Sequence, residues 1–284
     1  MSSHVALPTQ AKQLTGRKSS ARLSPPTMAS LLKRAMAGLV CASAVLAHAA
    51  LPDEIQVYTD DINAPGEKGM EIHINTTPRG IKEGSYPGET VNHLGLRVTP
   101  EISLGLTPTT DIGLYLPMVK SHDGKAELAG IKFRFKWLPI QAQDNAGFFA
   151  GLNFELGQLK QRYSQSPRSF ETRTILGWKN SQWLVAINPT FGWDVSPGYS
   201  HHSPDFSVGT KVARKVSESV ALGVEYYNGR GRMNDQLPGA LQEKATYLVM
   251  DYEGAPFNFN FGVGKGQTAA TDAWTIKGII EAAF

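Results

Sequence analysis

Apolar and polar residues alternate along most of this sequence, and one run is longer than an ordinary soluble sheet needs. The stretch VNHLGLRVTPEISLGL alternates for about 16 residues, from Val91 to Leu106. Alternation alone would also fit a soluble sandwich, whose strands usually span about five or six residues. A tilted strand that crosses a bilayer needs about 9–11 residues. The length of this run therefore favours a membrane-spanning strand.

Other stretches repeat the pattern with strongly apolar faces. Residues 257–265 (FNFNFGVGK) place three phenylalanines and a valine on one face, and residues 130–137 (GIKFRFKW) oppose four apolar side chains to three basic ones. From Leu51 to Phe284 no run approaches the 18 apolar residues of a transmembrane helix, and none sustains a helical period of 3.6. The sequence predicts an all-β chain.

Strand lengths and connections specify the architecture further. The connections alternate between short turns (TPTT, KNS, EGA) and longer loops (QRYSQSPRS, SPGYSHHSP), as in outer-membrane barrels. Large aromatic residues fall near both strand ends, as in interfacial girdles. We therefore predict a closed antiparallel transmembrane β-barrel of about twelve strands within residues 67–284, with both termini in the periplasm. The strands are expected at 67–78, 90–106, 111–120, 126–138, 147–160, 169–178, 182–195, 204–214, 219–229, 243–252, 256–265 and 273–284.

The final strand, WTIKGIIEAAF, has one apolar face and ends on the aromatic Phe284. In a closed barrel the last strand must pair with the first, because lipid cannot satisfy an open edge. This ending resembles the C-terminal signature of Gram-negative outer-membrane β-barrels. The resemblance implies that the barrel insertion machinery recognises Phe284, and that lipid of the outer membrane surrounds the protein.

The N-terminal region predicts export. After Met28, two basic residues precede a short apolar run and an Ala-His-Ala site, so residues 28–49 have the pattern of a signal peptide. Residues 1–27 are interpreted as a non-native or disordered leader. Removing residues 1–49 takes away six of the 28 basic residues and no acidic one, which leaves 22 against 25 acidic residues. This slightly acidic balance gives no indication of a nucleic-acid partner.

The acidic segment at residues 50–66 precedes the first strand. We expect it to lie in the periplasm, and the alternative is a small plug inside the barrel. Its carboxylates lack the spacing of a calcium loop. The only cysteine, Cys41, falls within the signal peptide, which excludes a cysteine-based metal site from the remaining chain. We expect neither a metal nor a cofactor.

Charged residues on the inner faces are the candidate functional set. They form either salt bridges that fill a narrow barrel or a constriction that selects solutes by charge. The three basic residues of the 130–137 strand would favour anions locally. The pore-lining candidates are Arg97, Glu101, Lys132, Arg134, Lys136, Glu155, Arg173, Asp194, Lys211 and Glu225.

One stretch raises the alternative of a lipid hydrolase. His201 and Ser203 have the His-x-Ser spacing of the twelve-stranded outer-membrane phospholipases. The asparagine that follows in that family is missing from GTKVARK, and Pro204 places the pair in a loop rather than on a rigid strand. We therefore expect no catalytic residues.

The stretches GEKGMEIHIN, TPTTDIGLYLP and KVSESVALGVEYY resemble a family of outer-membrane proteins grouped with aromatic (phenol) degradation. The resemblance implies transport of small, aromatic solutes and assigns no binding residue. The sequence favours a narrow pore or transporter for small aromatic or anionic solutes, narrowed by the loop at residues 229–242. A non-conducting structural or surface-binding barrel is the alternative.

Overall fold

The computed structural model describes residues 53–200 and 203–284, and all regular secondary structure in this part is β-strand. No helix in the same residues has the length and apolar character needed to cross a membrane. The interpretations of residues 1–27 and 28–49 lie outside the described residues. The strands are β1 (Lys68–Arg79), β2 (Leu96–Thr107), β3 (Thr110–Tyr115), β4 (Met118–Lys120), β5 (Ala126–Leu128), β6 (Gly130–Ile140), β7 (Gly147–Leu159), β8 (Arg168–Lys179), β9 (Trp183–Asp194), β10 (Asp205–Lys215), β11 (Val220–Arg232), β12 (Asp235–Gln236), β13 (Glu243–Tyr252), β14 (Asn258–Gly266) and β15 (Trp274–Ala283).

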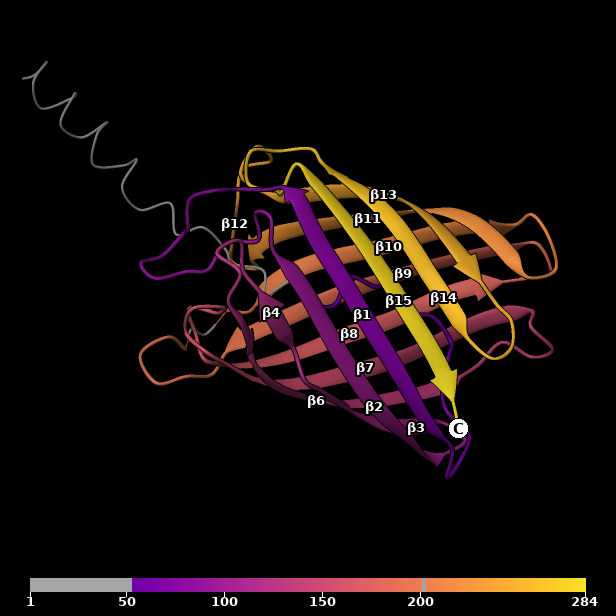
Figure 1. The fold of residues 1–284 in the computed structure, drawn as a ribbon. Coiled ribbons are helices and arrows are strands. Elements are labelled where there is room, and N and C mark those ends of the chain that lie inside the picture. Colours follow the sequence, from indigo (N-terminus) through magenta and orange to yellow (C-terminus); the bar gives the residue numbers. More distant parts are fainter. Residues whose placement is uncertain (1–52, 201–202) are drawn as a thin grey trace, which may run out of the picture. The chain divides into compact units, whose positions relative to one another are not determined.

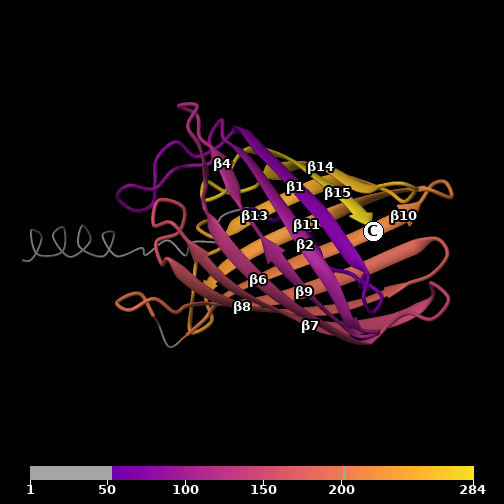
Figure 2. The same cartoon turned by 60° about the horizontal axis from the view of Figure 1, so that its bottom comes forward.

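The strands form one antiparallel sheet that closes on itself. Neighbours along the chain pair in turn, and the ring is completed where β1 pairs with β15 on one side and β2 on the other. Figures 1 and 2 show the indigo β1 beside the yellow β15. Beyond the last paired residues, Lys68 and Phe284 exchange two backbone hydrogen bonds, of 2.8 and 3.2 Å. The predicted pairing of the first and last strands is confirmed.

The wall contains twelve strands, as predicted, although two of them are interrupted. Strands β3 and β4 share one wall position, and both pair with β2. The break falls at Pro117, which has no backbone N–H to donate to the sheet. Strands β5 and β6 likewise share one position. The two-residue β12 pairs with the end of β11, so the predicted strand 219–229 extends to Arg232.

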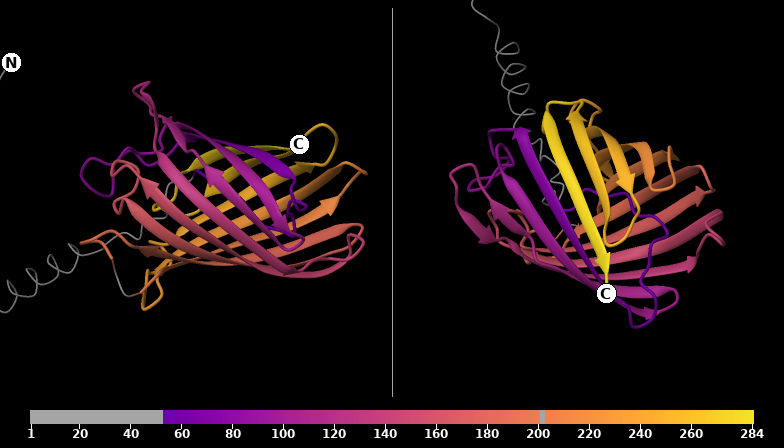
Figure 3. Two further views of the ribbon diagram at one scale, coloured as in Figure 1. Left: turned by 90° about the horizontal axis from the view of Figure 1, so that it is seen from below. Right: turned by 45° about the vertical axis from the view of Figure 1, so that its right-hand side comes forward.

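The two ends of the barrel differ in their connections. The end that holds Phe284 has the short turns, and the opposite end has the longer loops, the longest at residues 80–95 (Figure 3). The exposed Trp137 and Trp183 lie towards the short-turn end, and the exposed Trp274 lies at the opposite end. The predicted alternation of connections is present, with aromatic side chains near both ends.

The faces of the sheet reverse the pattern of a soluble protein. Along β6 the apolar Ile131, Phe133 and Phe135 are exposed, whereas the intervening Arg134 and Lys136 are buried. The same holds on β14, where Phe259 and its apolar neighbours face outwards. Soluble monomers rarely expose contiguous apolar patches beyond a few hundred Å². An apolar exterior around a polar interior is the surface of a barrel that sits in lipid.

Candidate functional site: the barrel lumen

The predicted pore-lining residues lie on the inner side of the wall with one marginal exception. Arg173 and Lys132 are partly buried there. Asp194 stands at the end of β9 and joins no ion pair among the described residues. The remaining candidates are buried inside the barrel: Arg97, Glu101, Arg134, Lys136, Glu155, Lys211 and Glu225.

The basic stripe on β6 is paired with carboxylates from neighbouring strands. Lys132 Nζ lies 3.0 Å from a Glu155 carboxylate oxygen, and Arg134 Nε lies 2.7 Å from one of Glu101. Asp111 on β3 meets Arg134 at 3.1 Å and Lys136 at 3.5 Å. A buried ion needs such partners, because removal from water costs several kcal/mol per ion. The β6 stripe is therefore largely neutralised.

A second network lies across the lumen, on β10, β11, β13 and β15. Lys277 Nζ donates to Glu225 at 2.5 Å, and Lys211 Nζ donates to Asp251 at 2.8 Å. Lys277 also donates to the backbone carbonyl of Ile55 at 2.9 Å. Ile55 precedes the barrel in sequence, so the second network contacts a part of the chain outside the wall.

Residues 53–60 are buried or half-buried inside the barrel, which corrects the expectation of a periplasmic segment for this part of 50–66. The side chain of Asn188 on β9 makes two hydrogen bonds with the backbone of Tyr58. The Tyr58 N–H donates to Asn188 Oδ1 at 2.6 Å, and Asn188 Nδ2 donates to the Tyr58 carbonyl at 3.1 Å. The Tyr58 hydroxyl lies 2.9 Å from that of Tyr115 on β3. Because Asn188 and Tyr115 belong to distant wall strands, the segment (hereafter the N-terminal plug, residues 53–66) crosses the lumen.

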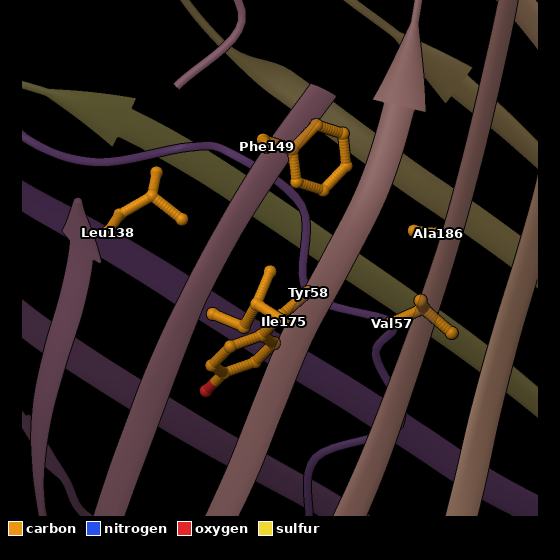
Figure 4. Close-up of a cluster of buried hydrophobic side chains, with 6 residues drawn as sticks. All are labelled: Val57, Tyr58, Leu138, Phe149, Ile175 and Ala186. Carbon is orange, nitrogen blue, oxygen red and sulfur yellow. The ribbon is translucent and has the colours of Figure 1, made fainter. Parts of the chain in front are cut away.

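Apolar side chains provide one physical reason for this location. Val57 is only 3% exposed and packs in a cluster with Leu138, Phe149 and Ile175, which come from β6, β7 and β8 (Figure 4). Ile55 packs separately against Tyr247 and Val249 of β13. Fully burying a side chain of this size stabilises the docked state by about 1.5–3 kcal/mol. A solvated periplasmic segment would forgo both contacts.

Opposite charges provide the second reason. Glu54 lies 3.3 Å from Arg173 and 3.8 Å from Lys132, and Asp53 lies 3.4 Å from Lys132. Towards the short-turn end, Asp60 lies 2.9 Å from Lys179. Burial favours the neutral acid of Glu54, but the charges of Arg173 and Lys132 outweigh it and hold the pKa of Glu54 below its ordinary value of 4.5. Glu54 therefore stays ionised at neutral pH.

A tight turn joins the plug to β1. The Asn63 side chain donates to Ser103 at 2.7 Å, and the Gly66 N–H donates to the carbonyl of Gly105 at 2.8 Å. The chain runs so close to β2 here that a Cβ at Gly105 would lie 2.0 Å from the carbonyl oxygen of Ala64. Only glycine allows this approach, so position 105 on the wall is matched to the plug.

Two cavities flank the plug. One of about 30 Å³ is bounded by Glu71, Glu101 and Arg134 of the wall. The other, of about 210 Å³, lies between the plug and the far wall and includes Lys211 and Glu225. Three plug residues, Gln56, Thr59 and Asp61, line both cavities. The plug therefore divides the free volume of the lumen.

The described residues do not show the catalytic arrangement that the hydrolase alternative needs. Ser203 Oγ accepts a hydrogen bond of 3.2 Å from the backbone N–H of Asn234. His201 lies outside the described residues, so the His-x-Ser pair is not placed.

Comparisons with solved structures identify the same fold. The chain is similar to the COG4313 outer membrane channel from Pseudomonas putida F1, with 10% identity and a TM-score of 0.56 over 81% of this chain and 100% of that one. It is also similar to the KdgM porin, with 9% identity and a TM-score of 0.51 over 76% of this chain and 99% of the porin. No protein-family model matches the sequence, and no curated protein sequence matches it.

The closed sheet, the apolar exterior and the charged interior define a transmembrane β-barrel of the outer membrane. Its fold is the one seen in these porin and channel structures. At such low identity the likeness concerns the fold, so the role of the lumen must come from its own residues.

Proposed function

We propose that the protein is a narrow outer-membrane channel for small anionic solutes, and that the N-terminal plug closes it. The observation that carries the proposal is the set of ion pairs between plug carboxylates and wall cations. Asp53, Glu54 and Asp60 pair with Lys132, Arg173 and Lys179. The plug is held by charge pairs, hydrogen bonds and two small apolar clusters, and each of these contacts is reversible.

Undocking of the plug changes the charge of the lumen. When the three plug carboxylates leave, the wall keeps all its cations and loses three negative partners. Lys179 then loses the partner that it has in the docked state, whereas Lys132 and Arg173 keep one wall carboxylate each. The opened lumen is more positive than the closed one, which favours passage of anions.

A solute with carboxylates can compete with the plug for the same cations. Arginine binds carboxylates in a forked geometry and lysine binds them as a point charge. The cavity of about 210 Å³ beside Lys179 and Lys211 provides a binding place for such a solute at the short-turn end. The predicted passage of aromatic solutes stays an expectation of the sequence resemblance alone.

Planar-bilayer conductance tests the proposal with two proteins, the parent and a variant that lacks residues 53–63. We expect rare or small openings in the parent, and frequent, larger and anion-preferring openings in the deletion variant. A shift in electrophoretic mobility on boiling checks that both barrels are folded. Equal conductance in the two proteins would show that the plug does not close the lumen.

The filled lumen also favours the second candidate, a non-conducting structural barrel. Large side chains that are less than 2% exposed occupy the interior at several levels, among them Arg97, Tyr115 and Phe149. In that case the plug would act as a core and stabilise the wall. Silence of the folded deletion variant in the bilayer would support this candidate and reject the channel.

A further inference from the structure

Three glutamates stand side by side on the inner face where the barrel closes. In the sheet register Glu71 of β1 lies opposite Glu281 of β15 and opposite Glu101 of β2. Like charges directly opposite each other destabilise a sheet. Arg134 compensates Glu101 at 2.7 Å, but among the described residues no lysine or arginine forms an ion pair with Glu71 or Glu281. The three carboxylates of this row therefore share one ion-paired cation, Arg134, and are short of positive charge.

His73 adds a nitrogen donor to the same place. Its side chain is 1% exposed, and neither ring nitrogen has a hydrogen-bond partner among the described residues. Nε2 lies 3.6 Å from a Glu71 oxygen and 4.0 Å from a Glu101 oxygen. A direct charge-assisted hydrogen bond would bring these atoms to about 2.7–2.9 Å. The imidazole therefore faces two carboxylates across a gap that none of the three side chains fills.

The gap has the size of a metal site. One donor atom each of Glu71, His73 and Glu101 can be chosen so that all lie within 4.8 Å of one another. Zinc bonds of about 2.0–2.2 Å at tetrahedral angles separate donor atoms by about 3.4 Å. The two distances from His73 Nε2, of 3.6 and 4.0 Å, exceed this by a few tenths of an ångström, so the side chains must move slightly closer to bind the ion. The adjoining cavity of about 30 Å³ has room for a water molecule as a fourth ligand.

We propose that Glu71, His73 and Glu101 bind one divalent transition-metal ion, for which Zn²⁺ is the suitable probe. An imidazole nitrogen beside two carboxylates suits zinc and its neighbours better than magnesium or calcium. The ion supplies the positive charge that the glutamate row lacks and links β1 to β2 beside the seam with β15. This departs from the expectation of no metal, which rested on the absence of cysteine and of a calcium-loop spacing.

The affinity is expected to be modest. The second ring nitrogen of His73, Nδ1, has no acceptor among the described residues. An outer acceptor of this kind usually orients a metal-binding imidazole, and its loss lowers metal affinity by about 10–100-fold.

The test is a calorimetric titration of the folded, tag-free protein in detergent, after dialysis against a chelator. We expect one Zn²⁺ to bind per chain, and Co²⁺ in its place to give a visible absorption band. His73→Gln and Glu71→Gln should each weaken binding at least tenfold. Glu171→Gln is the matched control, because Glu171 is a lumen carboxylate that pairs with Arg173 rather than with this site. It should bind Zn²⁺ like the parent.

Each outcome decides the proposal, independently of whether solutes pass through the lumen. Absence of stoichiometric binding in the parent overturns it. Binding at parental strength in both site variants also overturns it, because other residues of the chain would then hold the metal. A shift in mobility on boiling shows which variants are folded. If neither site variant folds, a variant with both His201 and His202 replaced by glutamine decides: it should bind Zn²⁺ like the parent, and loss of binding in it overturns the proposal.

Discussion

Replacing Glu54 by glutamine should open the channel without dismantling the wall. Glu54 lies 3.3 Å from Arg173 and 3.8 Å from Lys132, and its side chain is only 2% exposed. Removing one partner of a buried ion pair costs about 3–5 kcal/mol when it leaves a charge uncompensated. Here Arg173 keeps Glu171 at 2.9 Å and Lys132 keeps Glu155 at 3.0 Å. The expected loss is therefore smaller, about 1–3 kcal/mol, as for a hydrogen bond to a charged group.

The lost ion-pair energy destabilises only the docked state, so it shifts the equilibrium towards the undocked plug. A difference of about 1–3 kcal/mol raises the undocked fraction by about 5–150-fold, provided that this fraction is small in the parent. Single-channel recording measures it as the open probability. The matched control is Asp61→Asn, because Asp61 belongs to the same segment, is exposed and joins no ion pair among the described residues.

Two results would refute the reasoning about Glu54. If Glu54→Gln leaves the open probability unchanged while the barrel is folded, the ion pairs do not hold the plug. If Asp61→Asn opens the channel as much as Glu54→Gln does, the effect comes from the net charge of the segment and not from the contacts of Glu54.

Further predictions concern acid, lipid and assembly. Because the pKa of Glu54 is depressed in the docked state, its contribution to docking is complete at neutral pH and is lost as the pH falls below about 4.5, so the parent and Glu54→Gln should converge in conductance in acid. Leu248 lies in the middle of β13 and is 69% exposed, so Leu248→Lys should lower the free energy of unfolding in lipid by about 2–4 kcal/mol. Phe259 lies near the end of β14, so Phe259→Lys should lower it by only about 0–1 kcal/mol. Urea titration measures both values. Equal losses of stability in the two variants would contradict the depths in the bilayer assigned to Leu248 and Phe259. Phe284→Ala keeps the backbone bonds to Lys68, so it should reduce the yield of membrane-inserted protein in cells while sparing the stability of the refolded barrel.

The strands of the barrel wall were predictable from the sequence because a strand in lipid must alternate apolar and polar side chains along its whole length. The faces of 130–137 and 257–265 follow directly from that rule, and so does the closure of the final strand on the first. The interruption at Pro117 was not predicted. A proline removes one N–H from the sheet, but Pro100 and Pro189 lie within unbroken strands, so a proline alone does not specify a break. The residues on either side of Pro117 continue the apolar–polar alternation, so the sequence pattern does not reveal the break.

The plug was named only as the alternative to a periplasmic segment, because its apolar pattern is too short to favour burial. Ile55 and Val57 alternate with Gln56 and Tyr58 only once, and their apolar partners are contributed by distant strands. One signal was available. The ten pore-lining candidates contain six cations and four carboxylates, so the predicted lumen had unpaired positive charge, and the acidic segment at 50–66 could have supplied the balance. The site around His73 depends on the sheet register, which brings Glu71 beside Glu101 and which composition cannot specify.

The turn at Gly66 sets the conditions under which a solute can compete with the plug. Since the plug and β1 are one continuous chain, the plug acts as a tethered ligand whose effective concentration is on the order of millimolar. A free anion with the same intrinsic affinity would have to reach that concentration before it took half of the binding positions. Scarce solutes would meet a closed channel, and only an abundant supply would hold it open.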